Sequence, residues 1–111
     1  LGVDTVVVAN RAGATALAAA LHERGYRRFG ILAGPPDHLT ARERHEGYVA
    51  GLAGRGTTVD PADVVTSAFT RDGGYEAMSA LLRSPDRPQC VLAVNDVMAV
   101  GAIAAARDAG V

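Results

Sequence analysis

The sequence predicts an α/β domain in which a parallel sheet carries helices on both faces, with its elements in the order βαβαβαβα. Four short, nearly continuously apolar segments are typical of strands covered on both faces, and they alternate with four longer segments whose apolar residues recur at helical spacing. Such alternation implies right-handed crossovers between parallel strands. The 111 residues, 49% of them hydrophobic, suffice for one domain with a core and are too few for two ordinary domains.

The first half of the chain predicts two strands and the helix between them. Residues 3–9 (VDTVVVA) are apolar and β-branched, and residues 12–24 carry alanines and leucines at helical spacing. Gly25 is placed to end that helix, and residues 29–33 (FGILA) form a second buried strand. Residues 34–36 (GPP) then force a loop at the carboxyl end of this strand.

The second half continues the alternation. Its expected elements are, in order, a helix over 41–55, a strand over 64–69, a helix from Asp72 or Gly73 to Leu82, a strand over 90–94 and a helix over 96–109. Thr40 is a suitable N-cap for the first of these helices, because Glu43 follows at the capping-box spacing. Pro85 and Pro88 separate the next helix from the strand that follows it.

Composition and charge argue against several classes of function. The formal net charge is −1, so the chain shows neither a nucleic-acid-binding nor a membrane-binding surface, and any DNA contact would come from residues outside it. The single cysteine, Cys90, begins an expected strand and predicts a buried structural thiol. No apolar run approaches the length of a membrane-spanning helix, and no secretion signal is visible. Because the chain begins at Leu1 and ends directly behind a helix, we expect it to be part of a longer protein.

In a parallel sheet with helices on both faces, ligands bind beyond the carboxyl ends of the strands. Asp96 follows the fourth expected strand, where a carboxylate either caps the next helix or accepts hydrogen bonds from a ligand, and Asn95 adds both donor and acceptor groups. Arg42 and Arg44 are placed in the first turn of the second helix, which is an unfavourable position for cations. They are either solvated surface residues or one half of an Arg–Asp clamp for a polar ligand.

Phe69 and Tyr75 flank a turn over residues 70–74, in which two glycines are expected to supply positive-φ freedom. Each ring either packs in the core or stacks on a ligand. The chain has no phosphate-binding glycine motif, no nucleophile elbow and no metal-ligand spacing among its three histidines, so we expect no cofactor, no metal site and no enzyme activity.

Five segments follow one another along the chain: NRAGAT (10–15), LHERGYRRFGILAGP (21–35), ARERHEGY (41–48), FTRDGGYEAM (69–78) and RPQCVLAVNDVMAVGA (87–102). In this order they resemble the effector-binding region of LacI/GalR-type bacterial transcription regulators. The last pattern and the Arg-x-x-Gly-aromatic pattern also recur in periplasmic sugar-binding proteins of the same fold. The stretch GYRRFGILAGP is similar to the regulators' pattern and favours them over the secreted binders.

The resemblance implies one lobe of a two-lobe, periplasmic-binding-protein-like fold that holds a small ligand between its lobes. Residues 1–111 would form most of the C-terminal lobe, without the helix-turn-helix that binds DNA. Carried over by position, the resemblance implies that Arg44 binds the effector and that Asp96 accepts hydrogen bonds from its hydroxyl or N–H groups. It further implies that the pocket is lined by Thr40, Phe69, Tyr75 and His38, and the amide side chain of Asn95, next to Asp96, is expected to contact the ligand as well.

The same resemblance implies a cytoplasmic homodimer that controls an operator through its absent DNA-binding part, and whose effector is a sugar or related polyol, with a purine as the alternative. Two other functions stay open at this point. A sugar-binding component of a transport system would share the pocket and report to a permease. A small α/β enzyme is the third possibility, for which the chain offers no recognisable nucleophile, metal cluster or phosphate loop.

Overall fold

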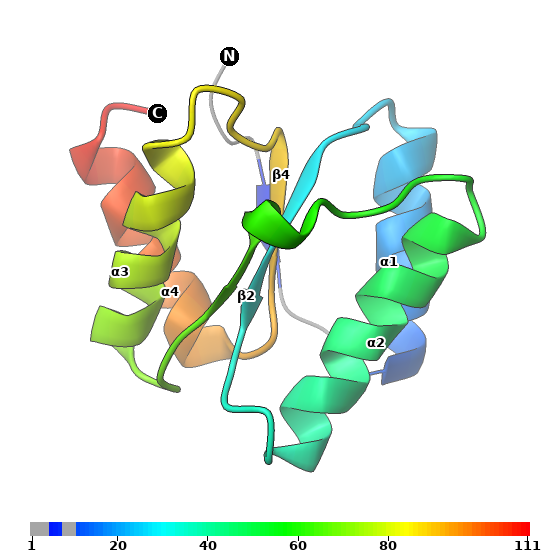
Figure 1. The fold of residues 1–111 in the computed structure, drawn as a ribbon, viewed down its shortest axis with the longest axis horizontal. Helices are drawn as coiled ribbons and strands as arrows, with labels where there is room; N and C mark the ends of the chain where they lie inside the picture. Colours follow the sequence, from blue (N-terminus) through cyan, green and yellow to red (C-terminus); the bar gives the residue numbers. More distant parts are fainter. Residues whose placement is uncertain (1–4, 8–10) are drawn as a thin grey trace.

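The predicted alternation of strands and helices is confirmed in the computed structural model, which describes the backbone of residues 5–7 and all of residues 11–111 (Figure 1). The strands are β1 (Thr5–Val7), β2 (Phe29–Ala33), β3 (Val64–Thr66) and β4 (Cys90–Ala93). The helices are α1 (Arg11–Glu23), α2 (Leu39–Ala53), α3 (Arg71–Leu82) and α4 (Asp96–Asp108), with a short 3-10 helix, η1 (Pro61–Asp63), before β3. The remainder of the expected first strand, 3–9, lies outside the described residues.

The four strands form one parallel sheet in the order β1-β4-β2-β3, as the predicted fold class requires. Helices α1 and α2 pack together on one face of this sheet, and α3 and α4 pack together on the other (Figure 1). All residues of β2 and β4 are buried, which explains their continuously apolar sequences, and Cys90 is buried as predicted. None of the described helices has the length and apolar character needed to cross a bilayer.

Glycines set how closely the two helices of each pair approach. A Cβ added at Gly74 of α3 would overlap the backbone of Met98 in α4, and one at Gly101 of α4 would overlap the carbonyl oxygen of Arg71. On the other face, a Cβ at Gly47 of α2 would lie 2.6 Å from the carbonyl oxygen of Arg11. The helices therefore touch backbone to backbone, which no larger residue at these positions would allow.

The expected turn with positive-φ glycines at 70–74 is wrong. Gly73 and Gly74 are residues of α3, and the described glycines with positive φ are Gly25, Gly56 and Gly110. Gly25 does end α1 as predicted, because its φ of 109° turns the chain and lets the amide of Tyr26 donate to the carbonyl of Leu21.

The third strand is shorter than expected. It ends at Thr66, and after the amide of Ser67 donates to Ala33 the chain leaves the sheet, so Phe69 lies in a loop. The start of β3 is held by the carboxylate of Asp63, whose side chain is 3% exposed and whose Oδ2 lies 3.1 Å from the Arg28 guanidinium. Burial raises the pKa of the Asp63 carboxyl, and the positive charge of Arg28 partly offsets that rise.

The expected N-cap of α2 is also wrong. The helix begins at Leu39, and His38 occupies the N-cap without a side-chain capping bond, so Thr40 is already helical. The turn that precedes the helix, in which the amide of His38 donates to the carbonyl of Pro35, brings the chain into helical conformation earlier than the capping-box pattern suggests. Glu43, the expected capping partner, instead lies 3.9 Å from Arg11 of α1.

Replacing Gly74 by alanine tests the backbone contact between α3 and α4. The three atoms nearest to the added Cβ are backbone atoms of Met98, which cannot rotate away, so we expect Gly74→Ala to destabilise the protein by about 1–3 kcal/mol in urea unfolding. Gly54→Ala is the matched control. Gly54 has φ −62° and no Cβ contact under 3.5 Å, so the alanine should stabilise the protein by about 0.5–1 kcal/mol. Equal effects of the two substitutions would contradict the packing argument.

Candidate functional site

The carboxyl ends of β2, β3 and β4 meet at one edge of the sheet, at the bottom of Figure 1. Each strand there leads through a loop into the N-terminus of the next helix, so three loops and the first turns of α2, α3 and α4 surround the edge. This is the position at which parallel sheets of this architecture bind ligands.

Arg44 is anchored at this edge by the end of β4. Its Nη1 donates to the carbonyl oxygen of Val94 at 2.7 Å, and its side chain is partly buried. Its Nε is buried and has no hydrogen-bond partner among the described residues. A buried donor without a partner costs free energy, so the guanidinium retains hydrogen-bonding capacity that an acceptor on a ligand or a water could use.

The two arginines of α2 differ from the sequence expectation and from each other. Because α2 begins at Leu39, Arg44 is its sixth residue, so the prediction that it lies in the first turn is wrong and no unfavourable interaction with the helix N-terminus needs explaining. Arg42 lies nearer that N-terminus, is exposed, and donates to the carbonyl of Pro36 at 3.4 Å.

Tyr48 completes the attachment of α2 to β4 and was not among the predicted site residues. It lies one turn beyond Arg44 on the same face of the helix and is fully buried. Its hydroxyl donates to the carbonyl oxygen of Ala93 at 2.7 Å. The four-residue spacing of Arg44 and Tyr48, which places both side chains on one face of a helix, is the signal in the sequence that could have identified it.

The sequence left open whether Asp96 caps the following helix or is available to a ligand, and the structure assigns the cap to Asn95. Asn95 is the N-cap of α4, and its side-chain oxygen accepts from the amide of Met98 at 2.9 Å. Asp96 is the first helical residue and is exposed, and its carboxylate makes no hydrogen bond or ion pair with the described residues. The cap is thus supplied by Asn95, and the Asp96 carboxylate stays available at the edge.

An aromatic pair joins the loops that follow β2 and β3. The ring of His38 stands edge-on to the ring of Phe69, with 4.5 Å between ring centroids and an interplanar angle of 81°. The Phe69 ring also lies directly against Gly34, where a Cβ would overlap it. The backbone of one loop therefore fixes the aromatic ring of the other.

Thr40 is exposed in the first turn of α2 and therefore lies at the same edge. The hydroxyl of Tyr75 does not lie at this edge. The Tyr75 hydroxyl lies 2.6 Å from Oδ2 of Asp108, the last residue of α4, and α4 carries Asp108 about 18 Å along its axis from Asp96. The hydrogen bond to Asp108 raises the pKa of the Tyr75 hydroxyl. The structure therefore brings six of the seven predicted site residues to the edge and leaves Tyr75 away from it. No group of three or more potential metal-ligating side chains occurs in the described part of the chain.

Comparison with known proteins identifies the fold and its relatives. A family model described as a periplasmic binding protein-like domain matches residues 18–111. The HTH-type transcriptional repressor PurR of Haemophilus influenzae (strain PittEE) is 38% identical over 90 residues, which cover 81% of this chain and 27% of that protein. The HTH-type transcriptional repressor CytR of Escherichia coli (strain K12) is 36% identical over 110 residues, covering 99% of this chain and 32% of that protein.

Solved structures give the same result. A regulatory protein of the LacI family from Chloroflexus aggregans superposes with a TM-score of 0.85 at 32% identity, covering 96% of this chain and 38% of that one. A LacI family transcriptional regulator from Mycobacterium smegmatis superposes with a TM-score of 0.84 at 31% identity, covering 97% of this chain and 41% of that one. A sugar-binding transcriptional regulator of the LacI family from Escherichia coli superposes with a TM-score of 0.84 at 29% identity, covering 91% of this chain and 36% of that one.

The parallel sheet, its paired helices and the polar edge at its strand ends are those of one lobe of a periplasmic-binding-protein-like α/β fold. The chain belongs to the periplasmic binding protein-like domain family, as part of the effector-binding region of LacI/GalR-type regulators. It spans about a third or less of the length of the two curated relatives.

Removing the Tyr48 hydroxyl tests the attachment of α2 to β4. Tyr48→Phe leaves the buried carbonyl of Ala93 without this donor, so we expect it to lower the free energy of unfolding by about 1–2 kcal/mol. Tyr75→Phe is the matched control, because its hydroxyl bonds to an exposed carboxylate, and it should leave the unfolding midpoint almost unchanged. A Tyr48→Phe protein as stable as the wild type would show that this bond contributes nothing to the placement of α2.

Proposed function

We propose that this chain is the larger part of the C-terminal lobe of the effector-binding domain of a cytoplasmic LacI-type transcriptional repressor. A small effector binds in a cleft between this lobe and a second one, and a helix-turn-helix outside residues 1–111 binds the operator. The observation that carries the proposal is Arg44, anchored on β4 at the ligand edge of the sheet with a buried N–H that has no described partner. The relatives reported above, all of them transcription regulators, support the same function over that of a transport protein or an enzyme.

The chemistry of the edge favours a polyhydroxylated effector. A guanidinium donates to ring or hydroxyl oxygens, and the Asp96 carboxylate accepts from neighbouring hydroxyl groups. The Phe69 ring, held against Gly34, offers an apolar surface for the face of a sugar ring. We therefore propose a sugar or related polyol, in agreement with the sugar-binding regulator among the structural relatives, and keep a purine as the alternative that the same groups would recognise.

The proposed mechanism is a shift between two orientations of the lobes. An effector that bridges the cleft binds one orientation more tightly than the other, and it shifts the equilibrium only by that difference in affinity. The orientation of the lobes then sets the spacing of the DNA-binding parts of a dimer. Residues 1–111 supply one wall of the cleft, so the coupling is a property of the whole protein.

An apolar stripe on α4 supports the proposed homodimer. Val97, Val100 and Ile103 follow one another at helical spacing and are 48%, 54% and 43% exposed. Large exposed apolar residues gathered on one helix face are typical of protein–protein interfaces. We propose that a second copy of the protein covers this stripe.

The effector site is tested by ligand-induced stabilisation of the full-length protein. Sugars, sugar phosphates and nucleobases are screened for an increase in the thermal unfolding midpoint. Arg44→Met and Asp96→Asn should each abolish the shift caused by the active ligand. Arg42→Met is the control, since this exposed arginine bonds only the carbonyl of Pro36, and it should retain the shift. A shift that survives in both site variants would place the effector elsewhere.

The proposed dimer contact is tested by placing a charge in the stripe. Val100→Arg in the full-length protein should convert dimers to monomers in sedimentation velocity, because an arginine in an apolar interface loses its hydration without gaining a partner. Val49→Arg alters a similarly exposed valine on α2, across the sheet, and should leave the dimer intact. A dimer that withstands Val100→Arg would assign the interface to another surface.

A further inference from the structure

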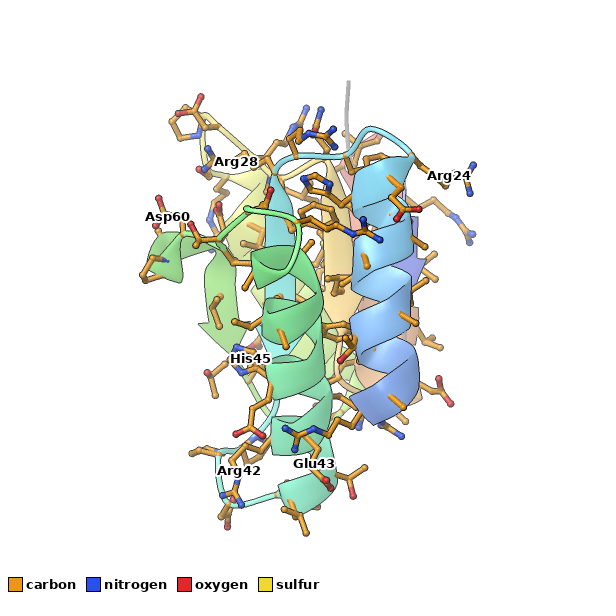
Figure 2. All side chains as sticks on the ribbon, turned by 90° about the vertical axis from the view of Figure 1, so that its right-hand side faces the viewer. Arg24, Arg28, Arg42, Glu43, His45 and Asp60 are labelled. Atoms are coloured by element: carbon orange, nitrogen blue, oxygen red, sulfur yellow. The ribbon has the colours of Figure 1, made fainter. Side chains whose placement is uncertain are left out.

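An open cavity lies on the opposite side of α2 from α1, along the outer edge of the sheet. It has a volume of about 470 Å³ and is formed by α2, the loop that follows this helix, η1 and β3. Its lining residues are His45, Val49, Ala53, Thr57, Thr58, Val59, Pro61 and Val64. Figure 2 shows His45 on the side of α2 that faces away from α1. The volume falls within the range of about 300–1,000 Å³ that is usual for small-molecule sites.

The walls of this cavity carry no acidic residue, no lysine and no arginine. Five of the eight lining residues are aliphatic, and Val49 is 41% exposed, so apolar surface is left open to solvent. The polar groups are the imidazole of His45 and the hydroxyls of Thr57 and Thr58. Burial lowers the pKa of His45, more than the nearby Glu46 carboxylate raises it, which favours a neutral ring that can both donate and accept a hydrogen bond.

This chemistry differs from that of the ligand edge, although the two places share one helix. Arg44 lies at the edge and carries a permanent charge. Its neighbour His45 lines the cavity and also borders a smaller pocket beside Arg42 at the end of β2. His45, Val49 and Ala53 follow one another at four-residue spacing, so they lie on one face of α2, which carries two apolar side chains and one imidazole. A ligand suited to the guanidinium and carboxylate of the edge would lose hydration in the cavity without gaining a charged partner.

We propose that the cavity beside β3 is a separate binding site for a neutral, mainly apolar small molecule with one or two hydrogen-bonding atoms. Charge complementarity determines this choice, because the lining offers no carboxylate, lysine or arginine to pair with an ionised ligand, and three polar side chains that can bind a neutral one. The aliphatic walls on α2 and β3 cover the faces of the ligand, and His45 or a threonine hydroxyl binds its polar atom. This site goes beyond the effector-binding function proposed above and does not depend on it.

The test uses the full-length protein with valine methyl groups labelled for NMR, and indole as the probe, since indole is neutral, flat and has one N–H donor. Indole should shift the methyl signals of Val49, Val59 and Val64 in a saturable way. Indole-3-carboxylate, which adds a charge to the same ring system, should bind at least tenfold more weakly. Absence of shifts at these valines up to the solubility limit of indole, or equal binding of the carboxylate, would overturn the proposal.

Variants separate this cavity from other surfaces. Ala53→Trp and, independently, Thr58→Trp each place a large ring in the cavity from an exposed position, and each should weaken indole binding at least tenfold. Ala50→Trp is the matched control, because Ala50 is exposed on α2 and does not line the cavity. Arg44→Met should leave indole binding unchanged even though it removes the proposed effector contact. Binding that survives both filling variants, or that Arg44→Met abolishes, would contradict a separate site.

Discussion

The central strand β4 is the element on which the placement of the candidate site depends. It is hydrogen-bonded to β1 on one side and β2 on the other, and all of its residues are buried. At its carboxyl end, where the sheet no longer satisfies the backbone, the carbonyls of Ala93 and Val94 accept from Tyr48 and Arg44. The same two hydrogen bonds therefore satisfy the strand, fix α2 against it and hold a guanidinium at the ligand edge.

The order of elements could be predicted because buried parallel strands have a simple signature. The segments at 29–33 and at 90–93 are apolar throughout and flanked by residues that end helices or strands, and both are strands within a residue of the expected bounds. The start of α2 could not be predicted, because the capping-box pattern at Thr40 says nothing of tertiary contacts. Glu43 faces Arg11 of α1 instead of the helix end. At the start of α2, tertiary contacts therefore decide where the helix begins, and the local capping-box pattern does not.

The candidate site could be predicted as far as topology alone places residues at the strand ends. Asn95 and Asp96 follow β4 directly and had to lie at the ligand edge once the sheet was parallel. Tyr75 sits on a helix, where sequence position does not fix which end of the helix pair the hydroxyl reaches, and it bonds to Asp108. Gly73 and Gly74 suggested a turn, because glycine can adopt positive φ. In the structure the missing side chain at these two positions instead allows neighbouring backbone to approach closely.

The glycine contacts make each helix pair a single block. Gly74 and Gly101 bring α3 and α4 together, and Gly47 and Gly51 do the same for α2 and α1. Two backbones in direct contact cannot slide past one another without a steric clash. The two helices of each pair therefore cannot shift relative to one another. An effector bound at the strand ends, as proposed above, would then act on the rest of the protein by changing the orientation of this lobe and not its shape. On that proposal, variants that bind the effector but no longer respond to it should lie in the connections to the second lobe.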